Sequence, residues 1–226
     1  FSDISTTSFY GSHIITAAGE GGMICLNNSE WEKRGRILRG WGRSSAVTES
    51  ENIDERYSSK LDGIPYDSKF IFEEIGYNFL PTEISAAFGL AQLKKLDRFK
   101  KIRNENFKKL EDFFSRLDYF ILPKRHKSAE NAWLAFPLTI TSDSPFSRLE
   151  IIKHLEKNQI QTRPIFTGNV LHQPAFKNIA HKNLETDFPN ANYIMENSFV
   201  IGCNQGLTLA HIEKITDTFK SFLSKY

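Results

Sequence analysis

Cysteine and long apolar runs are both scarce in this sequence. The two cysteines, Cys25 and Cys203, are far apart and belong to no pairing pattern, so we expect reduced thiols and a cytoplasmic protein. No stretch approaches the roughly 20 consecutive apolar residues of a membrane-spanning helix, and we expect no membrane partner. The histidines are scattered without metal-ligand spacing, so no metal site is predicted.

A strong excess of charge of either sign is also missing. The 29 basic and 27 acidic residues leave a formal net charge of +2, which offers no electrostatic basis for nucleic acid as a partner. Of the 226 residues, 40% are hydrophobic and 25% are charged, which is the balance of an ordinary globular protein. This length allows one large domain or two small ones.

The most informative segment is SFYGSHIITAAGEGG, residues 8–22. It places one imidazole, His13, between a short polar stretch and a glycine-rich turn, and the apolar run 23–26 follows directly. On local pattern alone, a histidine flanked by isoleucines is more often a structural residue than a catalytic one. The glycines by themselves indicate a tight turn between two strands, because glycine readily adopts positive φ.

As a whole, this segment resembles the cofactor-lysine segment of the DegT/StrS-type sugar aminotransferases. The resemblance implies an aspartate-aminotransferase-like subunit of fold type I that carries pyridoxal phosphate. His13 stands where that family keeps its lysine, and one extra alanine precedes the glycine turn. A transaminase needs an amine at this position, whereas an imidazole transfers protons near neutral pH. Histidine here is similar to the nucleotide-sugar 3-dehydratase branch of the superfamily, which uses pyridoxamine phosphate.

A second segment, GYNFLPTEISAAFGLAQL over residues 76–93, resembles the same family. Pro81 or Thr82 is predicted to begin a helix, and its small residues favour a buried, closely packed helix. The resemblance implies that Asn78 reaches across a homodimer to the cofactor phosphate of the partner subunit. It also implies that Ser8 positions the cofactor phosphate, although an ordinary turn hydroxyl is an equally good interpretation of Ser8 from the residues alone.

Residues 44–69 are polar, with few periodic apolar positions, and are predicted to form a long loop. The loop and the residues just before it resemble an iron–sulfur member of the dehydratase branch. The positions that hold cysteine in that relative are Ser45, Val47 and Glu55 here, and a cluster needs thiolates, so we expect no iron–sulfur cluster. By pattern Arg43 is a solvated loop residue, and the resemblance makes it a candidate for binding substrate.

The third matching segment is TRPIFTGN, residues 162–169, followed by Gln173-Pro174. By pattern alone Arg163 is a surface residue of a strand. The segment is similar to one in the dehydratase branch, which makes Arg163 and Asn169 candidates for binding a phosphate or hydroxyl of a nucleotide sugar.

The predicted fold class is α/β. The resemblance implies that residues 1–93 are the C-terminal part of an aspartate-aminotransferase-like large domain, and that residues 94–226 form a connector helix and a small C-terminal α/β domain. The family's phosphate loop, ring-stacking aromatic residue and pyridine-binding Asp precede the matched segments and have no counterpart here. We therefore interpret the sequence as the C-terminal half of a longer enzyme.

Apolar spacing and capping residues predict the individual elements. Helices are expected after Ser29 up to Gly40, over 93–117, 147–157 and 190–198, and from a cap at Thr208 to 223. Strands are expected over 23–26, where the strand is buried, and over 132–140, 160–163 and 199–203.

The resemblance implies a reaction, the C3 deoxygenation of a nucleotide-linked 4-keto-6-deoxyhexose during synthesis of a surface polysaccharide such as lipopolysaccharide O-antigen. His13 would remove a proton from the cofactor–substrate adduct. Two alternatives stay open: an aminotransferase of the same superfamily, and an inactive fragment that only folds or dimerises.

Overall fold

The computed structural model describes residues 2–183 and 186–226. It divides into two compact units, one up to Lys94 and one from Lys95 to Tyr226. Among the described residues, no helix is both long and apolar enough to cross a bilayer. The same residues bring together no group of three or more His, Cys, Asp or Glu side chains able to hold a metal ion.

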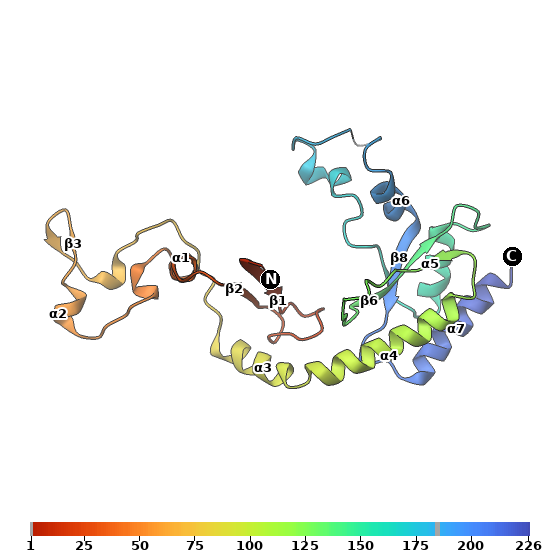
Figure 1. Ribbon diagram of the computed structural model, residues 1–226, viewed down its shortest axis with the longest axis horizontal. Helices are drawn as coiled ribbons and strands as arrows, with labels where there is room; N and C mark the ends of the chain where they lie inside the picture. The colour runs from red at the N-terminus through yellow and green to blue at the C-terminus, as the bar shows by residue number, and fades with distance from the viewer. Residues whose placement is uncertain (1, 184–185) are drawn as a thin grey trace. The chain divides into compact units, whose positions relative to one another are not determined.

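The first unit opens with an antiparallel hairpin, β1 (Ile4–Ser8) and β2 (Gly22–Leu26) (Figure 1). The sequence predicted a buried strand over 23–26, and this is wrong for the described chain, since the side chains of Met23 and Ile24 are 51% and 55% exposed. A two-stranded ribbon buries its side chains only where another layer packs on it. Here the described contact is made by Leu26, which lies against Gly35.

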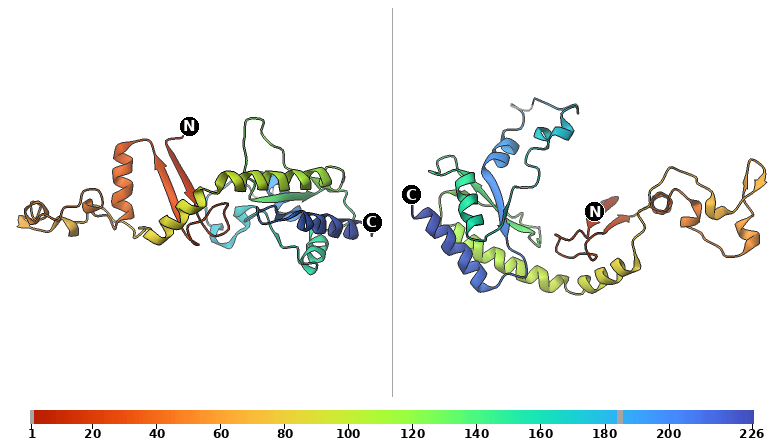
Figure 2. Two further views of the ribbon diagram at one scale, coloured as in Figure 1. Left: turned by 90° about the horizontal axis from the view of Figure 1, so that it is seen from below. Right: turned by 180° about the vertical axis from the view of Figure 1, so that it is seen from behind.

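Helix α1 (Ser29–Arg39) follows the hairpin, and Figure 2 shows both from other directions. The Asn28 side chain accepts a hydrogen bond from the Trp31 N–H at 3.0 Å, so the cap lies one residue before the predicted Ser29. The helix ends at Gly40, as predicted, where the Gly40 N–H donates to the carbonyl oxygens of Arg36 and Ile37.

The polar stretch after α1 is more structured than the long loop that was predicted. It forms the short helical turns η1 (Ser44–Ala46), α2 (Ile53–Arg56) and η2 (Ser68–Phe70), and a small hairpin of β3 (Lys60–Leu61) and β4 (Ile64–Pro65). Asx caps start two of these turns, because Asn52 accepts from the Asp54 N–H and Asp67 from the Lys69 N–H.

Helix α3 (Glu83–Leu93) begins at a Thr82 cap, as predicted. The prediction that this helix is buried is wrong for the described chain, in which none of its residues is buried. Ile84 is 78% exposed and Leu90 is 65% exposed. The small residues indicate close packing from sequence, but packing requires a neighbouring element; one described neighbour is Ala17, whose Cβ lies 4.0 Å from a Cβ placed on Gly89.

The second unit is a four-stranded antiparallel sheet with helices packed around it. The strands β5 (Phe120–Ile121), β6 (Ala135–Ile140), β7 (Thr162–Arg163) and β8 (Ser198–Gly202) lie in the order β5-β6-β8-β7. The long helix α4 (Leu96–Phe114) packs against the closing helix α7 (Leu209–Leu223), as Figures 1 and 2 show. Helices α5 (Arg148–Lys157) and α6 (Pro189–Asn197) and the turns η3 (Val170–His172) and η4 (Pro174–Phe176) complete the unit.

Phenylalanine rings form the core of this second unit. Every second residue of β6, from Phe136 to Ile140, is buried, which is the two-residue period of a strand with one covered face. The Phe114 ring lies 5.3 Å from Phe136 and 4.7 Å from Phe219, centroid to centroid, so α4, β6 and α7 meet at one aromatic cluster. The predicted cap Thr208 begins α7, and the helix predicted over 147–157 is α5, with Ser147 as its cap.

Candidate functional site

The loop that joins β1 and β2 carries two of the predicted site residues, Ser8 and His13. The Ser8 hydroxyl accepts a hydrogen bond from the Tyr10 N–H at 3.3 Å, and the Tyr10 carbonyl accepts one from the His13 N–H at 2.9 Å. Ser8 is exposed, and it therefore acts here as a turn hydroxyl. The imidazole of His13 is half-buried and forms no hydrogen bond to any described residue.

Glycines and one alanine give this loop its shape. Ala18 has a φ of 60° and Gly19 a φ of 121°, so the chain reverses where the sequence indicated a glycine turn. Ala17 is buried, and a side chain at Gly21 would meet its Cβ at 2.8 Å. A Cβ at Gly89 would lie 4.0 Å from the same atom, so the loop approaches helix α3 at its glycine.

Asn78 lies at a second close approach, where residues 73–79 run beside the end of α1. The Trp41 N–H donates to the Tyr77 carbonyl at 2.9 Å, and Asn78 pairs with Gly40 as an isolated bridge. The Asn78 side chain is exposed and forms no hydrogen bond within the described residues. We call this pairing the glycine junction, because it depends on Gly42 and Gly76.

Those two glycines cannot carry side chains. A Cβ on Gly42, whose φ is 84°, would lie 1.8 Å from the Glu74 carbonyl oxygen, and a Cβ on Gly76 would lie 2.1 Å from the Gly42 nitrogen. Backbone atoms therefore cross in direct contact here. The sequence analysis missed this crossing, although two glycines flanking predicted site residues were a signal that could have found it.

Arg43 follows the junction and is half-buried. Its guanidinium carbon lies 4.4 Å from the centre of the Trp41 ring, and its Nη1 donates to the Lys69 carbonyl oxygen at 3.2 Å. Its Nε is shielded from solvent and has no hydrogen-bond partner among the described residues. Arg43 is therefore only partly solvated, which differs from the interpretation of it as a solvated loop residue.

Arg163 lies on the short strand β7 of the second unit. Its side chain is exposed and donates to its neighbour's carbonyl, from Nη1 to the Thr162 oxygen at 2.8 Å. The strand is shorter than the predicted 160–163, and Glu156 of α5 holds it by accepting from both the N–H and the hydroxyl of Thr162, at 2.5 and 2.8 Å. These hydrogen bonds lower the pKa of the Glu156 carboxyl.

Asn169 is buried at the end of the loop that follows β7. Its Oδ1 accepts from the Leu171 N–H at 3.1 Å, and its Nδ2 donates to Oδ1 of Asn192 in α6 at 2.7 Å. Gly168, at a φ of 63°, packs so closely on Met195 that a Cβ would meet its side chain at 2.6 Å. In this structure Asn169 shapes the loop, and contact with a substrate stays a prediction.

The predicted site residues thus form three local groups. Ser8 and His13 share the hairpin loop, Asn78 and Arg43 flank the glycine junction, and Arg163 and Asn169 share the loop after β7. Sequence reasoning missed Phe166 in that last loop, a bulky residue at a φ of 46° and 80% exposed. A non-glycine residue at positive φ is uncommon, and only the backbone geometry reveals it.

The donor set of the first unit suits a phosphate-bearing pyridine cofactor. An exposed hydroxyl (Ser8) and an exposed amide (Asn78) are groups of a kind that binds phosphate, and an imidazole without a hydrogen-bond partner among the described residues (His13) is of a kind that accepts a proton. When bound, such a cofactor would supply an amine and an electron-accepting ring. The described residues therefore fit the cofactor that the resemblance implies.

Comparison with known proteins gives the family. The chain is 34% identical to the lipopolysaccharide biosynthesis protein RfbH of Salmonella typhimurium, across 98% of this chain and 52% of that protein. It is 31% identical to the dTDP-4-dehydro-2,6-dideoxy-D-glucose 3-dehydratase of Saccharopolyspora spinosa, across 100% of this chain and 49% of that enzyme.

A solved structure matches as well. Escherichia coli GDP-4-keto-6-deoxy-D-mannose-3-dehydratase with bound hydrated PLP superimposes with a TM-score of 0.79 at 28% identity, across 96% of this chain and 54% of that one. The chain therefore spans about half the length of the relatives it matches. Its fold is that of PLP-dependent aminotransferases, with mixed helix and sheet, as the sequence predicted. Residues 1–220 match the DegT/DnrJ/EryC1/StrS aminotransferase family, and the chain belongs to that family.

Proposed function

We propose that the protein carrying this chain removes the C3 hydroxyl of a nucleotide-linked 4-keto-6-deoxyhexose with pyridoxamine phosphate as cofactor. The observation that carries this proposal is His13, an imidazole in the half-buried loop where the resemblance implies an amine. Relatives named as 3-dehydratases of nucleotide sugars, and one named for lipopolysaccharide biosynthesis, support the substrate class and a role in surface polysaccharide (O-antigen) synthesis.

His13 acts as the base in this proposal. Pyridoxamine phosphate supplies the amine that condenses with the substrate ketone and the ring that accepts electrons. His13 would accept a proton from the bound cofactor–substrate adduct and would return it to the C3 hydroxyl, which would leave as water. A neutral imidazole suits this step because its ordinary pKa lies near neutrality.

The other predicted residues bind the cofactor or the nucleotide-sugar substrate in this proposal. Ser8 and, across a homodimer, Asn78 hold the cofactor phosphate; Arg43 and Arg163 hold anionic or hydroxyl groups of the nucleotide sugar. Asn169 acts from within the loop after β7, whose course it sets. We further propose that the enzyme is cytoplasmic and works without an iron–sulfur cluster.

An aminotransferase is the second candidate, because relatives named GDP-perosamine synthase also match the chain. That reaction needs an amine where the chain has His13. A protein that only folds or dimerises is the third.

Substitution of His13 separates these candidates. Wild-type protein, pyridoxamine phosphate and a panel of GDP-, CDP- and dTDP-linked 4-keto-6-deoxyhexoses are incubated, and the 3-deoxy product is measured by mass spectrometry. We expect His13→Asn to lower the rate by about 100-fold or more, the usual effect of losing a general base. We expect His13→Lys to abolish dehydration and to hold pyridoxal phosphate covalently, so that borohydride fixes it to the protein.

Two results would contradict the proposal. Wild-type protein that already holds pyridoxal phosphate covalently, or that transfers an amino group to the sugar, would indicate an aminotransferase. Wild-type protein that binds neither pyridoxamine phosphate nor pyridoxal phosphate in equilibrium dialysis would indicate a protein that only folds or dimerises.

A further inference from the structure

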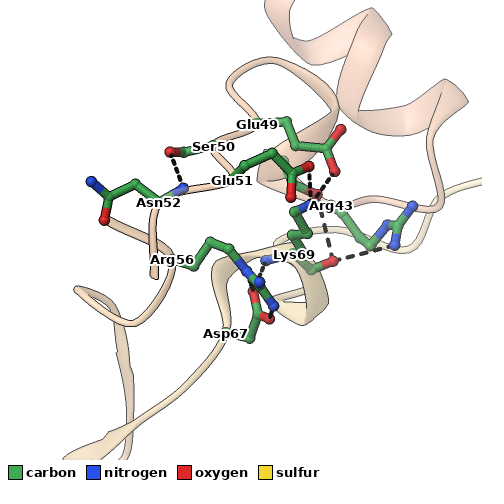
Figure 3. Close-up of polar contacts among 9 residues, drawn as sticks. Arg43, Glu49, Ser50, Glu51, Asn52, Arg56, Asp67 and Lys69 are labelled. Carbon is green, nitrogen blue, oxygen red and sulfur yellow. Dashed lines mark hydrogen bonds and ion pairs between the residues drawn. The ribbon is translucent and has the colours of Figure 1, made fainter. Parts of the chain in front are cut away.

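Five charged side chains form ion pairs and hydrogen bonds with one another in the polar stretch after α1. We call them the loop cluster: Glu49, Glu51, Arg56, Asp67 and Lys69, drawn in Figure 3. The Lys69 ammonium lies 3.0 Å from a carboxylate oxygen of Glu49 and 2.9 Å from one of Glu51. The Asp67 carboxylate accepts from the Arg56 guanidinium and, at 3.0 Å, from the backbone N–H of Lys69.

The loop cluster takes the place of a hydrophobic core in this stretch. Of the described residues 44–70, only Asp67 is buried, at 7% exposure, whereas Ile53 and Ile64 are 58% and 64% exposed. The Lys69 side chain is 19% exposed, but its partners Glu49 and Glu51 are 59% and 87% exposed, so solvent screens these two ion pairs. The better shielded pair is Arg56–Asp67, whose side chains are 26% and 9% exposed. The described side-chain contacts of this loop are therefore mainly polar.

Lys69 joins this cluster to Arg43. Its ammonium and its backbone N–H are both held by carboxylates, and its carbonyl oxygen accepts from Nη1 of Arg43 at 3.2 Å and from the Ser45 hydroxyl at 3.5 Å. The Lys69 carbonyl therefore sits where the two carboxylate contacts place it. Figure 3 shows Arg43 and Lys69 meeting at this oxygen.

Arg43 is held on two sides and keeps donors available. The Trp41 ring lies under the guanidinium plane, and the Lys69 carbonyl accepts a hydrogen bond from Nη1. Nε is shielded from solvent, so the donors left for a ligand are those of Nη2, which forms no hydrogen bond to a described residue, and the second N–H of Nη1. A planar guanidinium with an N–H pair presented from a rigid support is suited to bind a phosphate with two parallel hydrogen bonds.

We propose that Asp67 and Lys69 are positioning residues for Arg43, and that they hold its guanidinium ready for the diphosphate of the nucleotide-sugar substrate. This inference rests on the proposed function for the identity of the ligand. The orientation of Arg43 by the loop cluster stands on the contacts alone.

The first test follows the Arg43 side chain without any ligand. The Nε–H NMR signal of Arg43 is assigned by its loss in Arg43→Lys. We expect Asp67→Asn, which keeps the shape and removes the charge, to shift and broaden this signal. Asp67→Glu should restore much of it. Glu32→Gln, which breaks an exposed ion pair with Arg36 on α1, is the matched control and should leave the signal unchanged.

A folded Asp67→Asn protein, judged by far-UV circular dichroism, with an unaltered Arg43 signal would overturn the inference. If that variant does not fold, Lys69→Gln replaces it, because it leaves the Arg56–Asp67 pair intact. Lys69→Gln is expected to shift the Arg43 signal in the same direction, and an unchanged signal would again overturn the inference.

The second test measures binding of GDP, CDP and dTDP in parallel by calorimetry. For the nucleotide that the wild type binds, Asp67→Asn should raise Kd about tenfold, equivalent to roughly 1.4 kcal/mol and typical of a weakened charge-assisted hydrogen bond. Arg43→Lys combined with Asp67→Asn should bind no more weakly than Arg43→Lys alone. Additive losses would overturn the inference, because Asp67 would then act apart from Arg43.

Wild-type protein that binds none of the three nucleotides would count against the proposed function and against the diphosphate as ligand. The NMR test would still decide whether the loop cluster orients Arg43. The two failures are therefore distinguishable.

Discussion

Each of the two compact units is stabilised internally by a different kind of interaction. The second unit buries a contiguous set of rings, with Phe107, Phe114, Phe136, Phe199 and Phe219 fully buried. In the first unit, the described apolar residues that are buried are Ala17 and Ile37. Burying one phenylalanine side chain contributes about 1.5–3 kcal/mol, so only the second unit has a large hydrophobic contribution to its stability.

The first unit relies instead on the β1–β2 ladder, the glycine junction and the loop cluster. Its apolar side chains are largely exposed, with Ile75 at 95% and Ile84 at 78%. Exposed apolar residues in such number are typical of surfaces that other protein covers. The difference teaches that His13, the residue proposed to transfer the proton, lies in the unit with the weaker internal core, whereas Arg163 and Asn169 lie in the unit with the aromatic core.

The largest expected effect comes from separating the units. We expect residues 95–226 alone to unfold cooperatively on heating, because the aromatic core lies entirely within them. We expect residues 2–94 alone to show no cooperative transition. The contacts of the loop cluster and the glycine junction contribute too little free energy to offset the conformational entropy lost when the chain is ordered. Calorimetry and NMR chemical-shift dispersion measure both.

Two substitutions test whether the stability of the second unit comes from its aromatic core. Phe114→Ala in residues 95–226 should cost about 3–5 kcal/mol, the usual range for removing a buried aromatic side chain. Ile84→Ser, in the complete chain, should change the stability of the second unit by less than about 0.5 kcal/mol. A cooperative transition for residues 2–94 alone would break the comparison.

The glycine junction gives the next largest effect. Gly42 and Gly63 share a φ of 84°, but an added Cβ meets the Glu74 carbonyl at Gly42 and meets nothing within 4 Å at Gly63. Gly63→Ala should therefore cost only the left-handed backbone penalty of about 1–2 kcal/mol. Gly42→Ala should cost more and open the junction, seen as faster hydrogen exchange at the Trp41 and Tyr77 amides. Equal exchange in the two variants would contradict this account.

Acid should loosen the first unit before the second. The pKa of Asp67 is lowered by the hydrogen bond from Arg56, and that of Glu51 by the hydrogen bond and charge of Lys69. A depressed pKa gives stability that is present above the unfolded value, about 4, and is lost as pH falls through the folded value. Hydrogen exchange at the Lys69 amide should thus accelerate below about pH 4.

The second unit also has lowered carboxyl pKa values, at Glu150 through Ser147 and at Glu156 through Thr162. Its aromatic core does not titrate, so its tertiary NMR signals should persist to lower pH than the Lys69 protection. Asp67→Asn should remove most of the pH dependence at Lys69. If the Lys69 amide protection and the tertiary NMR signals of the second unit were lost at the same pH, the loop cluster would have no separate stability.

Helix starts were predictable to within one residue where a capping residue lies beside the helix in the sequence. Helices begin after Thr82, Ser147 and Thr208, as expected. The side-chain oxygens of Thr82 and Ser147 accept from the backbone N–H three residues on, and the Thr208 N–H donates to the His211 imidazole. The glycine turn implied a strand before it without giving bounds for β1, and β5 was missed, because two to five residues carry too little periodicity to identify a strand.

The candidate site was predictable in its residues and not in its contacts. His13 and Asn78 were recognisable from motifs, and both remain accessible in the described chain. The hydrogen bonding of Arg43 to the Lys69 carbonyl was not, because it depends on ion pairs between residues spread from Glu49 to Lys69. The contact of the buried Asn169 amide was also not predictable, since its partner Asn192 lies on helix α6.

By itself the sequence determined the capped helix starts to within a residue, the imidazole in place of an amine and the resemblance to a family, because these depend on residue identity and near neighbours. Only the tertiary structure decided which apolar segments are buried, that Gly42 and Gly76 cross in contact, and that charges close the loop that holds Arg43. Burial, and contacts between residues far apart in the sequence, depend on where distant segments meet in space. Local patterns of side chains do not determine where those segments meet.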